Sequence, residues 1–163
     1  MRTSYQSEVS QIANFTFNIS KCRVTEFYNR VKSNDPAASV LFVIPIETSG
    51  LESQVNLEDS VSMTEVLDGT TNPQATMGNK TLADADLAAL PSPNFTDNSF
   101  ELDLPDITWT AATGNAISAL VVAYSSDGAG ALTTAIPMTY HDFVVTPDGS
   151  DIVATTTKFF DAA

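Results

Sequence analysis

One histidine and one cysteine are the residues best able to carry acid–base or nucleophilic chemistry in this chain of 163 residues. His141 is the candidate general base, because a neutral imidazole accepts a proton near neutral pH. A hydrolase would also need Cys22 or a serine delivered to His141 by the fold, and no serine lies in a G-x-S-x-G turn. We expect His141 to lie at a strand edge and to bond a neighbour, with no catalytic residue in the chain; a small hydrolase around His141 is the alternative.

Metal and cofactor chemistry has little support in the motifs. Cys22 has no second cysteine for a disulfide or a zinc site, so we expect a semi-buried small side chain. Acidic pairs occur at residues 148–151 and 84–86, but neither has the ligand spacing of an EF-hand. Gly128 and Gly130 open no phosphate-binding loop before a helix. The sequence therefore predicts no metal and no cofactor, with structural cation binding as the alternative.

The net charge excludes two classes of partner. Seven basic residues face twenty acidic ones, which gives a formal charge of −13 and a pI near 4.1. A nucleic-acid binder needs a basic surface, and so does a polybasic membrane anchor. Residues 1–8 lack the apolar core of a signal peptide, and the apolar run at residues 40–46 is too short to span a bilayer. We expect neither nucleic acid nor membrane as a partner.

Four of the seven basic residues lie within twelve positions, and they are Lys21, Arg23, Arg30 and Lys32. The rest of the chain is almost entirely of one sign, with no lysine or arginine at residues 33–79 or 81–157. The acidic side chains serve solubility in the simplest interpretation. The basic segment predicts contact with an acidic partner or a sister subunit. The predicted docking residues are Lys21, Arg23, Phe27, Arg30 and Lys32.

The elements that must position these residues follow from hydrophobic periodicity. Residues 15–19 alternate apolar and polar side chains, which predicts a strand. Apolar side chains then recur at i, i+3, i+4 and i+7 from Val24 to Val31, which predicts a short amphipathic helix beside the basic residues. Residues 40–46 are apolar on both faces and predict a strand buried on both sides, with Pro45 at an edge or bulge.

Short helices and many strands are expected in the remainder. Capping-box patterns at residues 62–65 and 81–84 predict two helices. The predicted strands cover residues 100–104, 107–110, 119–124 and 134–139, and residues 143–146 and 151–156 are expected to form a closing hairpin. This pattern predicts a mainly β domain, a β-sandwich or jelly-roll-like fold with two or three short helices in the N-terminal half. One domain spans residues 1–163, with a docking segment (1–36), a mixed part (37–97) and a β-rich part (98–163).

Three segments carry a resemblance. Residues 103–115, residues 141–152 and residues 30–37 resemble motifs of small virion structural proteins of tailed bacteriophages. The match touches both ends of the chain and is looser in the middle. Residues 158–162 depart from it, since they lack a glycine before the aromatic pair and an arginine after it.

The resemblance implies a non-enzymatic virion protein, namely a head decoration or minor capsid protein. Its partners would be the major capsid protein or other virion proteins and further copies of itself, after assembly in the host cytoplasm. The alternatives are a tail or neck component, tube-like or adhesin-like, and a carbohydrate- or cell-surface-binding sandwich. Glycan binding would use Trp109 as an exposed platform, whereas core packing is the ordinary role of a single tryptophan in a strand.

Overall fold

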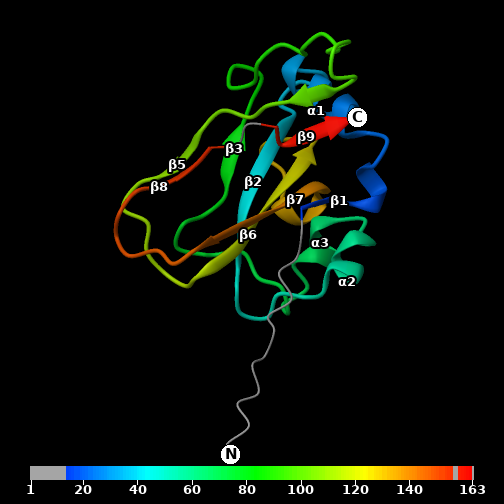
Figure 1. Ribbon diagram of the computed structural model, residues 1–163. Helices are drawn as coiled ribbons and strands as arrows, with labels where there is room; N and C mark the ends of the chain where they lie inside the picture. The colour runs from blue at the N-terminus through cyan, green and yellow to red at the C-terminus, as the bar shows by residue number, and fades with distance from the viewer. Residues whose placement is uncertain (1–13, 156–157, 163) are drawn as a thin grey trace, which may run out of the picture.

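The computed structural model describes residues 14–155 and 158–162, and antiparallel strands dominate it (Figure 1). Three short α-helices lie in the N-terminal half: α1 (Val24–Lys32), α2 (Gln54–Glu58) and α3 (Met63–Val66). The strands are β1 (Phe15–Thr16), β2 (Val40–Glu47), β3 (Lys80–Leu82), β4 (Phe100–Leu102), β5 (Ile107–Trp109), β6 (Ile117–Ser125), β7 (Ile136–Val145), β8 (Ile152–Ala154) and β9 (Phe160–Ala162). Single 3-10 turns, η1 (Asn18–Ser20) and η2 (Leu132–Thr134), precede α1 and β7. The predicted mainly β, sandwich-like class with short N-terminal helices is confirmed.

The main sheet has the strand order β1-β7-β6-β2-β3, and each neighbouring pair is antiparallel. Its three long strands are β2, β6 and β7, with Leu41 opposite Tyr124 and Val121 opposite Tyr140. Two ribbons, β4–β9 and β5–β8, supply the remaining strand pairs. Figure 1 shows the β5–β8 ribbon beside the main sheet and α2 and α3 together at one end of it.

Strand alternation gives the sheet two buried faces. Successive side chains of a strand point to opposite faces, so neighbours in β2 and β6 enter different cores. One core joins α1 and the two ribbons to the sheet through side chains that include Val24, Val31, Leu41, Val43, Leu102, Trp109, Leu120 and Val122. The other joins α2 and α3 to the opposite face through Phe42, Ile44, Leu57, Met63, Val66 and Val121. Helices and ribbons therefore cover both faces of the central strands.

The central strand β2 agrees with its predicted pattern. All residues from Val40 to Ile46 are buried, as the prediction of a strand covered on both sides requires. A register shift lies between Ile46 and Glu47, one residue beyond Pro45. Proline has no N–H for the ladder, and the bulge expected near it is present.

The predicted closing hairpin is wrong. Residues 143–145 belong to β7, but β8 pairs with β5, so that Ile107 lies opposite Ala154 and Trp109 opposite Ile152. The turn before β8 binds the β5 side of the molecule: the Gly149 N–H donates to the Ala112 carbonyl, and the Ala112 N–H donates to the Ser150 carbonyl. The pairing of β8 depends on β5, which lies far away in the chain, and the local sequence pattern does not specify that partner.

Two other local predictions also fail. Residues 80–82 form β3 instead of leading into a helix, because they pair with residues 41–43 of β2 and bury Leu82. The Asp86 carboxylate then accepts from the Ala83 N–H at 2.8 Å, which closes a turn. The predicted strand at residues 15–19 stops after Thr16, since η1 follows, and the buried Ser20 hydroxyl donates to the Pro137 carbonyl at 2.6 Å.

Candidate functional site

Helix α1 has the amphipathic build that its sequence predicts. Val24, Phe27, Tyr28 and Val31 form its buried stripe. Arg30 and Lys32 lie in its last turn, where the partial negative charge of the helix C-terminus favours cations. The helix therefore displays basic side chains outward while its apolar side joins the core.

One carboxylate orders two of the guanidinium groups. Glu26 accepts from Arg23 Nε at 3.0 Å and from Arg30 Nε at 2.8 Å. These hydrogen bonds hold the pKa of the Glu26 carboxyl below its usual range. Exposed pairs contribute little to stability, so their consequence is positional: both arginines are fixed on one surface. Four cations and one carboxylate give residues 21–32 a net charge of +3.

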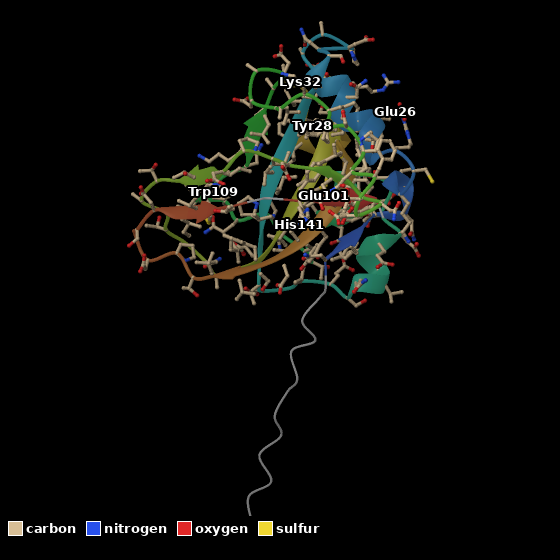
Figure 2. The ribbon with its side chains drawn as sticks, turned by 45° about the horizontal axis from the view of Figure 1, so that its top comes forward. Glu26, Tyr28, Lys32, Glu101, Trp109 and His141 are labelled. Carbon is tan, nitrogen blue, oxygen red and sulfur yellow. The ribbon has the colours of Figure 1, made fainter. Side chains whose placement is uncertain are left out.

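The chain that follows β3 lies beside this helix. Lys32 Nζ donates to the Asp84 carbonyl at 2.9 Å, and the Tyr28 hydroxyl donates to the Ala88 carbonyl at 3.0 Å. Figure 2 places Glu26, Tyr28 and Lys32 at the same end of the molecule. The sequence pattern did not predict this neighbour, because residues 84–88 are 52 or more positions away from the groups that they bond.

Phe27 does not belong to the docking residues, which corrects the sequence prediction. Its side chain is 1% exposed and stacks on Tyr124 with ring centroids 4.6 Å apart. The Arg23 guanidinium lies 4.3 Å from the Phe27 ring centroid. A buried ring covered by an arginine cannot meet a partner. We use "docking surface" below for Lys21, Arg23, Arg30 and Lys32, which are exposed or half-exposed.

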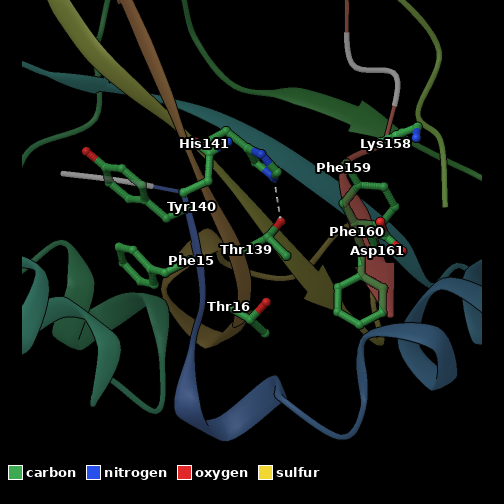
Figure 3. Close-up of a pocket in the computed structure, with 10 residues that line it drawn as sticks. Phe15, Thr16, Thr139, Tyr140, His141, Lys158, Phe159, Phe160 and Asp161 are labelled. Carbon is green, nitrogen blue, oxygen red and sulfur yellow. Dashed lines mark hydrogen bonds between the residues drawn. The ribbon is translucent and has the colours of Figure 1, made fainter. Parts of the chain in front are cut away.

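His141 bonds a neighbour, as its sequence position predicts. Its Nε2 lies 2.8 Å from Thr139 Oγ1, on the same strand and beside a hollow of about 200 Å³ (Figure 3). Burial lowers the pKa of His141 to about 4, so the imidazole is neutral at pH 7. The hydroxyl that it contacts belongs to Thr139, which is only 2% exposed. The imidazole and the hydroxyl therefore form a contact within one strand, β7.

Trp109 lies in the core and cannot serve as a glycan platform. Its side chain is 2% exposed, and Nε1 donates to the Gly78 carbonyl at 3.0 Å. A ligand platform requires an exposed ring face. The core-packing interpretation of Trp109 is therefore correct.

The fluorescence of Trp109 provides a direct check of this placement. We expect acrylamide to quench the folded protein much less than the urea-unfolded protein, because the single indole is shielded by the packed core. A Stern–Volmer titration in both states measures the difference. Equal quenching constants in the two states would contradict a buried Trp109.

The acidic side chains at residues 148–151 accept hydrogen bonds from backbone N–H groups. Asp148 Oδ1 accepts from the Ser150 N–H at 2.9 Å, and Asp151 Oδ1 accepts from the Ala111 N–H at 2.8 Å. Within residues 14–155 and 158–162 no group of three or more histidine, cysteine or acidic side chains could hold a metal ion. Cys22 is exposed, so the expectation of a semi-buried thiol is wrong. Cys22 lies between η1 and α1 in the chain and belongs to neither of the two hydrophobic cores.

Comparison with known proteins finds no matching family, no matching curated protein and no matching solved structure. In the part of the chain that the structure describes, no helix combines the length and apolar character needed to cross a bilayer. The site must therefore be interpreted from its own geometry. One feature that sequence reasoning missed is Phe95, whose side chain is 87% exposed.

Proposed function

We propose that this chain is a non-enzymatic virion structural protein of a tailed phage, a head decoration or minor capsid protein that binds the capsid surface. The docking surface on α1 is the observation that carries the proposal. In a chain of net charge −13, it gathers most of the cations on one helix and its leading turn. Such a patch favours an acidic protein surface, through complementary potential that guides encounter and orientation.

The rest of the molecule supports an architectural role. Both faces of the main sheet are packed, which makes a rigid body for repeated contacts. His141 is neutral and tied to a buried hydroxyl residue, which disfavours the alternative of a hydrolase. Trp109 is buried, which disfavours the alternative of a carbohydrate-binding module. Further copies of the chain are expected on a symmetric particle, since each equivalent capsid site presents the same partner.

Counting copies in purified particles tests the location. We expect quantitative mass spectrometry of purified particles to find this chain at a copy number comparable with that of the shell protein. A few copies per particle would instead support the tail or neck alternative. Absence of the chain from particles would overturn the proposed function.

Neutralising the docking surface tests the mechanism. We expect the combined variant Arg23→Gln, Arg30→Gln, Lys32→Gln to reduce the copies bound per particle by about tenfold or more, since three interfacial charges are lost together. Raised salt should weaken binding of the natural chain in the same direction. The measurement is the ratio of this chain to shell protein in particles assembled with each variant.

A matched control separates local charge from total charge. Thr108→Glu, Thr110→Glu and Thr113→Glu change the net charge by the same amount at exposed positions in and beyond β5, which Figure 1 shows apart from α1. We expect this control to be incorporated normally. If both variants lose binding equally, or if the docking-surface variant is incorporated like the natural chain, docking through α1 is wrong.

A further inference from the structure

Phe95 is the most exposed large apolar side chain of the described residues. It is 87% exposed, compared with 75% for Val55 and 67% for Val144. Phenylalanine is a frequent core residue, and a protein that leaves its ring in water forgoes the free energy of burying it. Every residue from 88 to 98 is exposed, so Phe95 stands on a projecting loop and does not cover a neighbouring core.

Hydrogen bonds hold the tip of this loop in one shape. The Asn94 N–H donates to the Ser99 carbonyl at 2.8 Å, and the Ser99 N–H returns a bond to the Asn94 carbonyl at 3.2 Å. Inside this bridge, Asn94 Oδ1 accepts from the Thr96 N–H at 3.0 Å, and Asn94 Nδ2 donates to Asp97 Oδ2 at 2.7 Å. Little backbone freedom remains to be lost when the ring is bound. The loop therefore presents Phe95 in a preorganised position.

This loop continues from the segment that contacts the docking surface. The Asp84 and Ala88 carbonyls accept from Lys32 and Tyr28 of α1, and residues 90–98 follow directly. Figure 1 shows the chain between β3 and β4 crossing the end of the molecule that carries α1. At its other end the loop enters β4, where Glu101 pairs with Lys158. The loop that carries Phe95 thus begins beside the basic helix and ends beside the Lys158–Glu101 pair.

We propose that Phe95 is the apolar anchor of the same interface, and that it inserts into an apolar pocket on the capsid protein that binds the docking surface. This inference rests on the proposed function. Charge complementarity specifies the rim of that pocket: carboxylates on the side that meets α1, and cations opposite Asp97. Interfaces of this kind concentrate their binding energy in a few buried aromatic or arginine side chains surrounded by a polar rim.

A second copy of this chain is a poorer receptor. The hollow beside His141 has about 200 Å³, but Asn14, Lys158 and Asp161 contribute to its lining. Burial of a phenylalanine ring against such groups would strip them of water without replacing their hydrogen bonds. A different protein with an apolar pocket is therefore the occupant to which the proposal commits.

The test compares Phe95→Ser with Val55→Ser in otherwise natural full-length chains. Val55 is similarly exposed but lies on α2, against the other core. We expect Phe95→Ser to lower the number of copies per particle by about tenfold or more, as loss of a central anchor does. We expect Val55→Ser to be incorporated normally. Both exposed substitutions should leave the melting temperature almost unchanged, which keeps folding out of the comparison.

The possible outcomes separate this inference from the proposed function. If the natural chain is absent from particles, the proposed function fails. If the natural chain is present and Phe95→Ser is incorporated equally well, the anchor is wrong while the proposed function stands. Sedimentation of the free chain and flotation with phosphatidylcholine vesicles complete the test. Loss of self-association or of vesicle binding in Phe95→Ser would identify a second copy or a lipid surface as the occupant and would overturn the capsid pocket.

Discussion

Replacing Phe27 with alanine is expected to lower the free energy of unfolding by about 3–5 kcal/mol, the range for truncating a fully buried phenylalanine. The ring is 1% exposed and stacks on Tyr124 of β6, while Val24 and Val31 fill the same core from neighbouring turns of α1. The cost combines lost burial with an unfilled cavity between the helix and the sheet. Urea denaturation followed by circular dichroism measures this free energy.

The same substitution at Phe95 is the matched control. Phe95→Ala removes an identical group from a side chain that is 87% exposed, so we expect a change within about 0.5 kcal/mol. The two phenylalanines therefore have opposite expected signatures: Phe27 acts on stability, and Phe95 on binding to particles. A Phe27→Ala variant as stable as the natural chain would show that α1 is not packed through this ring.

Periodicity predicted α1 and β2 because their patterns depend on immediate neighbours. An apolar residue at every third or fourth position fixes one buried side of a helix, and an unbroken apolar run fixes a strand with two buried faces. Both patterns are decided within ten residues, and the structure agrees with them. The capping pattern at residues 62–65 also led to a helix, although Ser62 makes no side-chain cap hydrogen bond and Glu65 accepts from the Val61 N–H at 2.7 Å instead.

Strand pairing was not predictable in the same way. β8 lies close to β7 in the chain and was assigned to it, yet it pairs with β5, more than forty residues earlier. Similarly, β9 pairs with β4, which starts at Phe100. Each choice depends on which apolar side chains share a core, so it is a property of the assembled fold and not of the local sequence.

Some residues of the candidate site can likewise be predicted from the sequence, and others only from the fold. The cluster of basic residues is visible in the sequence because charge needs no fold to be counted. Phe27 and Phe95 are both aromatic residues near turns or helices, and only the fold shows that the first is covered by Arg23 and the second by nothing within the described residues. A signal for Phe95 did exist, since it is a lone aromatic side chain in a stretch rich in proline and asparagine, where loops are expected.

The charged residues that give the net charge of −13 are distributed unevenly over the molecule. Acidic side chains are spread over the body, while Glu26 is the partner of two arginines on the docking surface. Mutual repulsion keeps such bodies apart in solution. Neighbouring copies on a particle would then need an attachment stronger than their repulsion, which the proposed combination of a basic helix and the Phe95 ring would supply.

Acidification is expected to destabilise the fold through His141. Burial lowers its pKa from 6.5 to about 4, so the unfolded chain takes up a proton in this interval that the folded chain does not. Stability from this residue is complete above pH 6.5, falls as the pH drops towards 4, and changes no further below that value. We expect a loss on the order of 2 kcal/mol, reduced from the full linkage value because part of the side chain remains in contact with water.

His141→Gln isolates this contribution. Glutamine keeps a hydrogen-bonding group for Thr139 but does not titrate, so its unfolding free energy should lack the loss between pH 6.5 and 4. The other charged groups near the hollow, which are Asp142, Asp161 and the Lys158–Glu101 pair, are the same in both proteins, so their contributions cancel in the difference. Urea denaturation of both proteins across this interval gives the difference curve. A curve that is flat with pH would mean that His141 becomes protonated as readily in the folded chain as in the unfolded one, and that its ring is not held neutral against Thr139 and Phe159.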